Sequence, residues 1–181
     1  DKVLGIMGLG RIGVDVARVG IATGMQVIAW SENLTQDKCD EVGARLVTKE
    51  ELLRQSDFLT IHLLLSDRTR GLLQAADLAR MKPSSYIINT SRGPIIDEPA
   101  LIDALQNRKI AGAGIDVFEV EPLPLDHPLR DMPNMVIMPH LGYVTVENYQ
   151  NWYGGTVENI RSWLDGKTIN QMSGRNPTTP G

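Results

Sequence analysis

The segment Gly8-Leu9-Gly10-Arg11-Ile12-Gly13, which fits the pattern G-x-G-x-x-G, constrains the fold more than any other feature of the sequence. It follows a short apolar run from Val3 to Met7, typical of a buried strand, and opens a segment from Arg11 to Thr23 with apolar residues near helical spacing. Between strand and helix, the first glycine permits a tight turn, the second lets backbone approach a pyrophosphate, and the third lets helix and strand pack closely. The free amides of the helix N-terminus attract phosphate. The motif therefore predicts dinucleotide binding, and the alternative is a tight turn without a ligand.

The alternation of strand and helix continues along the chain. Further strands are predicted at Val27–Trp30, Phe58–Leu63, Tyr86–Asn89, Ala113–Val117 and Met135–Met138. Further helices are predicted from the capping box Thr48-Lys49-Glu50-Glu51, at Ala75–Met81, and from the N-cap Asp97 to about Asn107. Several strands are continuous apolar runs, as expected for a parallel sheet buried on both faces. The pattern predicts an α/β domain with a doubly wound parallel sheet.

Two stretches interrupt this pattern. Glu119–Pro133 contains four prolines and is predicted to be a long extended loop, and Ser173–Gly181 is predicted to be a flexible tail. Between them, an apolar stripe at helical spacing is expected to pack in the core, the alternative being docking onto a part of the protein outside this chain. The stripe consists of Val157, Ile160, Trp163 and Leu164.

Composition excludes several classes of function. The 181 residues carry a net charge of −4, which disfavours nucleic-acid binding. The single cysteine, Cys39, excludes an internal disulfide and a cysteine-based zinc site, and favours a cytoplasmic protein. No apolar run approaches the roughly 20 residues of a membrane span. Because the first strand starts almost at the first residue, without an initiator Met or a signal peptide, we expect the chain to have been cut from a longer protein.

The end of the second predicted strand indicates which cofactor is preferred. An acidic residue there binds the ribose 2′-hydroxyl of NAD, whereas a nearby Arg favours the 2′-phosphate of NADP. Here the sequence is Trp30-Ser31-Glu32-Asn33, with Ser31 about where the acidic residue is expected. Ser31 does not repel a phosphate, but Glu32 does, and no Arg stands beside it. The sequence favours NAD and leaves NADP open.

Polar residues follow the later predicted strands, at the sheet edge where ligands of α/β proteins bind. They are Arg92 in Asn89-Thr90-Ser91-Arg92-Gly93, then Asp116, Glu121 and His140 in Pro139-His140-Leu141-Gly142. An Arg there binds a carboxylate, a His acts as general acid or base, and a neighbouring Glu stabilises the imidazolium. Each residue also has an alternative without a catalytic role. Arg92 could be a surface residue after a turn, Asp116 a carboxylate at a strand end with its hydrogen bonds satisfied, and His140 a capping residue. His62 is interpreted as packing and His127 as a loop residue.

Four segments together resemble the cofactor domain of the D-isomer-specific 2-hydroxyacid dehydrogenases, the family of D-3-phosphoglycerate dehydrogenase and glyoxylate/hydroxypyruvate reductase. In chain order they are Gly5-Ile6-Met7-Gly8-Leu9-Gly10-Arg11-Ile12-Gly13, Asn89-Thr90-Ser91-Arg92-Gly93, Gly114-Ile115-Asp116-Val117-Phe118-Glu119-Val120-Glu121-Pro122 and Pro139-His140-Leu141-Gly142. The resemblance covers about residues 1–165. It implies a Rossmann-type dinucleotide-binding domain over 1–165, with a C-terminal helix, and a tail over 166–181 that returns to a substrate domain outside this chain.

The resemblance also implies a reaction and the residues that perform it. Hydride passes between NAD(P)(H) and a D-2-hydroxy or 2-oxo acid, with Arg92 binding substrate, His140 donating the proton and Glu121 paired with it. Cofactor contacts are implied at Gly8, Gly10, Arg11, Ile12, Gly13, Ser31, Leu63, Thr90, Ser91, Arg92, Asp116, His140, Gly142 and Tyr143. A small acid substrate and a homodimer are the implied partners. The chain alone is not expected to turn over substrate at an appreciable rate, because the other wall of the cleft lies outside it.

Three positions depart from the family pattern. Ser31 replaces the common Asp, Leu64 stands where Pro is frequent, and Tyr143 occupies a position that is commonly small. Two other functions stay open: a non-catalytic dinucleotide sensor resembling a corepressor, and an enzyme resembling phosphite dehydrogenase. The presence of Arg92, Glu121 and His140 together favours catalysis over sensing, and Glu121 disfavours formate chemistry, where Gln is usual at that place.

Overall fold

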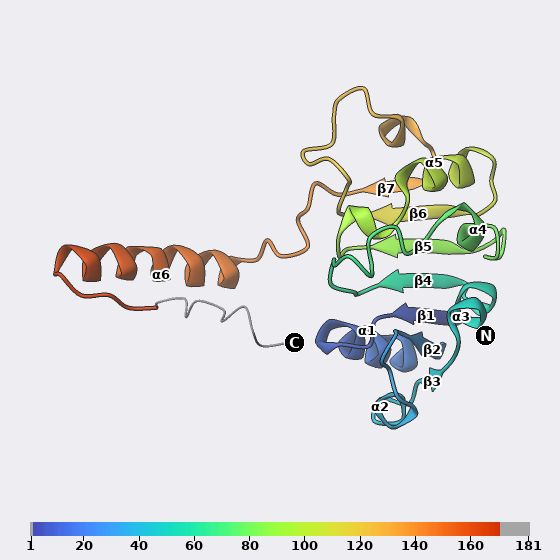
Figure 1. Ribbon diagram of the computed structural model, residues 1–181, viewed down its shortest axis with the longest axis horizontal. Helices are drawn as coiled ribbons and strands as arrows, with labels where there is room; N and C mark the ends of the chain where they lie inside the picture. The colour runs from blue at the N-terminus through green and yellow to red at the C-terminus, as the bar shows by residue number, and fades with distance from the viewer. Residues whose placement is uncertain (1, 171–181) are drawn as a thin grey trace. The chain divides into compact units, whose positions relative to one another are not determined.

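The computed structural model describes residues 2–170, in two compact units that divide after Gly142. The first unit is built on a parallel sheet of seven strands in the order β3-β2-β1-β4-β5-β6-β7, and all its arrows point the same way in Figure 1. The strands are β1 (Val3–Met7), β2 (Gln26–Trp30), β3 (Arg45–Leu46), β4 (Phe58–Ile61), β5 (Tyr86–Asn89), β6 (Gly112–Ile115) and β7 (Met135–Ile137). The predicted doubly wound α/β fold is confirmed.

Helices connect the strands. They are α1 (Arg11–Ala22), α2 (Gln36–Asp40), α3 (Lys49–Gln55), α4 (Ala75–Leu78) and α5 (Glu98–Gln106), with short 3₁₀ helices η1 (Gly93–Ile95) and η2 (Pro128–Asp131). From β1 the chain winds outward through β2 to β3, then returns to β4 on the other side of β1 and proceeds to β7. The strand order therefore reverses between β1 and β4. Sheets of this kind bind ligands at such a reversal, beyond the carboxyl ends of the strands.

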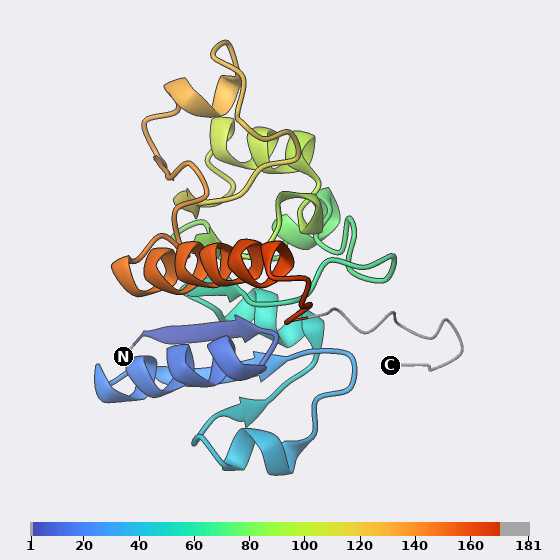
Figure 2. The ribbon, with the colours of Figure 1, turned by 90° about the vertical axis from the view of Figure 1, so that its left-hand side faces the viewer.

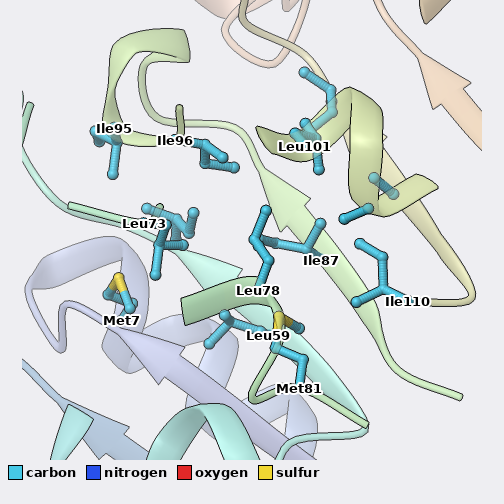
Figure 3. Close-up of a cluster of buried hydrophobic side chains, with 14 of the residues drawn as sticks. Met7, Leu59, Leu73, Leu78, Met81, Ile87, Ile95, Ile96, Leu101 and Ile110 are labelled. Atoms are coloured by element: carbon cyan, nitrogen blue, oxygen red, sulfur yellow. The ribbon is translucent and has the colours of Figure 1, made fainter. Parts of the chain in front are cut away.

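Apolar residues cover both faces of the sheet, which explains why the strands are continuously apolar. On one face, Leu4 and Ile6 of β1 pack with Ala17 of α1 and Cys39 of α2. On the other, residues of β1, β4 and β5 pack with helices α3, α4 and α5, and Figure 3 shows part of this cluster around Leu78. Because all seven strands are parallel, their carboxyl ends meet at a single edge of the sheet.

Helix α1 approaches the sheet through its small residues. It runs alongside β1 and β2 (Figures 1 and 2) and buries Gly13, Ala17 and Gly20, whereas Ile12 and Val19 are each 64% exposed. A Cβ atom added to Gly20 would lie 2.6 Å from Cδ2 of Leu4. Small residues at this contact therefore set how closely the helix lies on the sheet.

Two helices begin with the capping interactions that the sequence predicted. Thr48 and Glu51 make the reciprocal hydrogen bonds of a capping box at α3, and Asp97 caps α5 by accepting from the Ala100 amide at 2.9 Å. The segment Glu119–Pro133 is a loop, as predicted, and contains only η2. Helix α2 and strand β3 were not predicted, because they are five and two residues long and bury little.

The second unit contains α6 (Val146–Leu164), which Thr145 caps by accepting from the Asn148 amide. None of its residues is buried, and Trp163 and Leu164 are 72% and 70% exposed. The prediction that its apolar stripe packs in the core is therefore wrong. The expected tail, Ser173–Gly181, lies outside the described residues, and the division expected at residue 165 stays a prediction. Within residues 2–170 no helix has both the length and the apolar character needed to cross a membrane.

Candidate active site

The glycine loop connects β1 to α1 in a conformation that only glycine tolerates. Gly8 has φ +101°, and a Cβ there would lie 2.7 Å from the His62 carbonyl oxygen. A Cβ on Gly13 would lie 2.2 Å from the carbonyl oxygen of Gly8. Both glycines are therefore required by the fold itself.

Gly10 differs from its two neighbours, because a Cβ there would meet no atom within 4 Å. It stands at the N-cap of α1, where no side chain caps the helix and no acidic residue occupies the first turn. Packing gives no reason for glycine at this position. The open space over the helix amides fits an anionic group such as a pyrophosphate.

A cavity of about 690 Å³ opens beside this loop at the carboxyl ends of β2, β1 and β4. Four of the predicted cofactor residues line it: Gly8, Gly10, Ser31 and Leu63. Arg11 and Ile12 begin α1 and are exposed. The cavity is of the size that small-molecule sites usually have.

His62 also lines the cavity, although its side chain was predicted only to pack against its neighbours. It is half-buried, and its Nε2 atom lies 3.0 Å from the Thr60 hydroxyl. Burial lowers the pKa of His62 below its ordinary value, so that the ring is neutral near pH 7. The apolar residues after His62 concealed this position in the sequence.

A buried asparagine holds the loop that carries Arg92. Asn89 ends β5 and is 1% exposed. Its side chain donates to the Arg92 carbonyl oxygen at 2.9 Å and accepts from the Ser91 amide at 3.0 Å. The Ser91 hydroxyl in turn donates to the Ile61 carbonyl oxygen at 2.8 Å. Asn89 is therefore a positioning residue, a role that its place in the sequence motif did not indicate.

Asp116 fixes the turn that carries His140. It is 6% exposed, and its two oxygens accept from the amides of Leu141 and Gly142, each at 2.8 Å. His140 has φ +56°, a left-handed conformation that is uncommon for residues other than glycine and recurs at functional sites. The carboxylate therefore holds the backbone that carries the His140 side chain, and its own predicted contact with the cofactor stays a prediction.

His140 and Glu121 form a close pair. Nδ1 of His140 lies 2.6 Å from Oε2 of Glu121, and both side chains are about one-third exposed, at 33% and 34%. The other carboxylate oxygen of Glu121 accepts from the Phe118 amide at 2.9 Å. The carboxylate thus binds the imidazole through Nδ1, which fixes the orientation of the ring.

Burial and neighbouring charges shift the pKa of Glu121 in opposite directions. Burial raises its pKa, but the hydrogen bonds from His140 and the Phe118 amide, with the charges of His140 and Arg92, bring that pKa below its ordinary value. Glu121 is therefore ionised at neutral pH. Arg92 follows β5 at the same edge of the sheet, and its predicted role beside this pair stays a prediction.

The proline-rich loop that carries Glu121 is held at both ends. A Cβ on Gly93 would lie 2.0 Å from the carbonyl carbon of Phe118, so η1 and this loop are in direct backbone contact. His127 Nε2 lies 3.1 Å from Glu98 Oε1, and Arg130 donates to the carbonyl oxygens of Leu123 and Pro124. His127 is thus a structural residue of the loop.

The predicted residues fall into two groups along one edge of the sheet. The cavity occupies the ends of β2, β1 and β4, whereas Arg92, Asp116 and His140 follow β5, β6 and β7. Thr90 and Ser91 lie at the end of β5, and Gly142 closes the Asp116 turn. Tyr143 belongs to the second unit, where its ring lies 5.4 Å from that of Trp152, so its predicted cofactor contact stays a prediction.

Comparison with known proteins agrees with this geometry. Residues 1–142 match the family model described as D-isomer specific 2-hydroxyacid dehydrogenase, NAD binding domain. The glyoxylate reductase of Aeropyrum pernix is 46% identical over 146 residues, which are 81% of this chain and 44% of that protein. The chain thus spans less than half the length of this relative. The predicted cofactor, NAD, is confirmed by the family model.

Solved structures of dehydrogenases also superpose on this chain. A putative D-3-phosphoglycerate dehydrogenase from Ralstonia solanacearum superposes with a TM-score of 0.87 at 38% identity, over 95% of this chain and 50% of that one. A D-lactate dehydrogenase with NAD+ from Lactobacillus jensenii superposes with a TM-score of 0.79 at 27% identity, over 96% and 56%.

Proposed function

Since the chain belongs to the D-isomer specific 2-hydroxyacid dehydrogenase family through its NAD binding domain, we propose that it forms the cofactor and acid–base part of such an enzyme. The reaction is hydride transfer between a nicotinamide and C2 of a small D-2-hydroxy or 2-oxo acid. The observation that carries the proposal is the 2.6 Å contact between His140 and Glu121. A non-catalytic dinucleotide sensor has no need of this acid–base pair.

Each charged residue has a separate task in this reaction. The bound nicotinamide supplies or accepts the hydride. His140 protonates the alkoxide that forms at C2 during reduction, and removes that proton during oxidation. The Glu121 carboxylate stabilises the imidazolium and keeps Nε2 directed at the substrate. Arg92 binds the substrate carboxylate and the carbonyl oxygen, so that developing charge meets a fixed cation.

The cofactor lies along the carboxyl edge of the sheet in this proposal. Its pyrophosphate contacts Gly8, Gly10, Arg11, Ile12 and Gly13, and its adenosine occupies the cavity beside Ser31 and Leu63. Its nicotinamide end reaches Thr90, Ser91, Asp116, His140, Gly142 and Tyr143. The open space above Gly10 and the uncapped N-terminus of α1 support this placement.

The whole protein is proposed to be a cytoplasmic homodimer with a separate substrate domain, as the family resemblance implies. The residues from 166 onward are proposed to lead back to that domain. Since the relatives are about twice as long, activity is tested in the full-length protein that contains this chain.

The experiment is reduction of glyoxylate and related 2-oxo acids with NADH, followed by the loss of reduced nicotinamide. His140→Gln is expected to lower kcat by at least about 10²-fold, because a general acid contributes about that much. Its affinity for NADH is expected to change little. Unchanged turnover in this variant contradicts the role assigned to His140, and absence of any 2-oxo acid activity in the natural protein contradicts the proposed reaction.

A further inference from the structure

We propose that Glu98, at the start of α5, is a positioning residue that holds Glu121 against His140. Its carboxylate contacts both ends of the span Glu119–His127, from which Glu121 reaches His140. This inference rests on the proposed function, because it needs the acid–base pair to act in the reaction. It goes beyond that function by giving a role to a residue outside the site that the sequence predicted.

The span Glu119–His127 contains neither helix nor strand. It lies between β6 and η2, which begins at Pro128, and its prolines Pro122 and Pro124 have no amide hydrogen to donate. Contacts with neighbouring elements must therefore replace the backbone hydrogen bonds that fix a strand. The contacts that reach the outgoing half of the span, where Glu121 lies, decide how well Glu121 is placed.

Glu98 contacts the span at its two ends. Oε1 of Glu98 lies 3.1 Å from Nε2 of His127, and Oε2 accepts from the Glu119 amide at 3.5 Å. The side chains of Glu98 and His127 are only 21% and 16% exposed, so water competes little for their contact. A single carboxylate thus closes the span into a loop, with Glu121 near one end.

A second contact of His127 defines which ring nitrogen carries the proton. Nδ1 of His127 accepts from the Leu129 amide at 3.4 Å, so this nitrogen is not protonated. The proton of the neutral ring is then on Nε2, which donates it to Glu98. His127 therefore joins η2 to α5 and is oriented as a donor towards the carboxylate.

Glu98 itself is held on a rigid element. Asp97 caps α5 directly before it, and α5 buries Leu101, Ala104 and Leu105 in the core. Glu98 lies in the first turn of this helix, where the free amides stabilise a negative charge. Its carboxylate is therefore fixed relative to the sheet, and it holds the span in register with the sheet edge.

The other contacts of the span do not replace Glu98. The backbone contact with η1 fixes the chain just before the span, and Arg130 donates only to carbonyl oxygens of the returning half. Arg70 lies 3.6 Å from Glu119, but their side chains are 57% and 47% exposed, and solvent screens such pairs. Loss of the Glu98 carboxylate should therefore displace Glu121 without unfolding the loop as a whole.

The test compares Glu98→Ala with Glu98→Gln in the full-length protein that contains this chain. Glu98→Ala is expected to lower kcat for 2-oxo acid reduction by about 10-fold, because small displacements of a catalytic group are costly, while the Kd of NADH changes by less than about twofold. Glu98→Gln keeps an oxygen that accepts from His127, so it is expected to retain most of the natural kcat. Glu50→Ala, which removes an exposed carboxylate from the first turn of α3, is the matched control and is expected to change neither value.

Two further measurements separate positioning from loss of stability. Glu98→Ala added to Glu121→Gln is expected to lower kcat by less than about twofold, because Glu98 acts only through Glu121. Amide hydrogen exchange in the span 119–127 is expected to be at least about tenfold faster in Glu98→Ala, with exchange in β5 unchanged. His127→Ala, which removes the other partner of the contact, is expected to show the same pattern and replaces Glu98→Ala if that variant does not fold.

The possible failures are distinguishable. A kcat for Glu98→Ala equal to the natural value overturns this inference and leaves the proposed function standing. Additive effects of Glu98→Ala and Glu121→Gln on kcat also overturn it, because Glu98 then acts by another route. Lower thermal stability with an unchanged kcat per folded molecule makes Glu98 purely structural and overturns it as well. Absence of 2-oxo acid activity in the natural protein overturns both proposals.

Discussion

Oε2 of Glu121 lies 2.6 Å from Nδ1 of His140, although the two residues belong to different loops, one rich in proline and the other closed by Asp116. Each loop is held independently of the other. The Phe118 amide and the backbone contact with Gly93 fix the first, and the carboxylate of Asp116 fixes the second. Contacts within each loop therefore hold the two side chains together, as expected of preorganised catalytic groups.

Removing the charge of Glu121 is expected to slow the reaction. In Glu121→Gln the side chain of His140 loses its ionised partner, so kcat for reduction of a 2-oxo acid should fall. The measurement is kcat for reduction at neutral pH. Glu41→Gln, which removes an exposed carboxylate remote in sequence from Glu121, serves as the control. An unchanged kcat in Glu121→Gln would mean that the pair has no role in proton transfer.

Asp116→Asn is expected to impair catalysis through the backbone. The amide side chain has only one oxygen to accept from the amides of Leu141 and Gly142, so one buried donor loses its partner, at a cost of about 1–3 kcal/mol. We expect kcat to fall while the KM for the 2-oxo acid changes less, because the His140 turn is displaced and Arg92 is not. Equal kcat values for the variant and the natural enzyme would remove the positioning role.

Gly10 and Gly13 of the loop are expected to respond differently to substitution by alanine. Gly10→Ala meets open space, so its thermal stability should stay near that of the natural chain, while NADH affinity falls because the methyl group occupies the cofactor's place. Gly13→Ala should unfold more easily by about 1–3 kcal/mol, since its Cβ collides with the backbone of Gly8. Thermal melts and NADH titrations of both variants check this. A Gly10→Ala chain with normal NADH affinity would place the pyrophosphate elsewhere.

The ionised carboxylate of Asp57 is expected to stabilise the fold, and this contribution to the unfolding free energy should be lost at acidic pH. Its hydrogen bond from the Val3 amide lowers its pKa, burial opposes this, and Lys82 and Lys2 add to the lowering. A depressed pKa contributes stability that is complete above the unfolded value of about 4 and is lost as pH falls through the folded value. Asp57→Asn should therefore lower the unfolding free energy at pH 7 and flatten its decrease below about pH 4. Urea unfolding at several pH values measures this, with the exposed Asp37→Asn as the control.

The sequence predicted the parts of the fold that depend on local signals. Strand β5, the capping box of α3 and the cap at Asp97 formed as expected, because hydrophobic runs and capping patterns are read from adjacent residues. The face of α1 could not be predicted in this way. Its contact with the sheet uses Gly13, Ala17 and Gly20, and only the closeness of the helix to the strand makes small residues preferable there.

Some residues of the candidate site could be predicted from the sequence and others could not, because only some depend on local signals. Residues at strand ends, such as Arg92 and His140, were identified because the ends of parallel strands meet at one edge. The place of His62 on the cavity and the positioning role of Asn89 were not, because each depends on which segments fold beside it. Exposure of the α6 stripe was missed because helical periodicity indicates an apolar face but not what covers it.

A titration of the 181-residue chain with NADH tests the central claim most directly, because Trp30 lines the cavity assigned to the cofactor. We predict saturable quenching of tryptophan fluorescence with one NADH bound per chain, and loss of most of that quenching in Trp30→Phe with the affinity kept. Retention of the full quenching in Trp30→Phe would place the cofactor elsewhere. Absence of saturable binding to the natural chain would contradict the dinucleotide site itself.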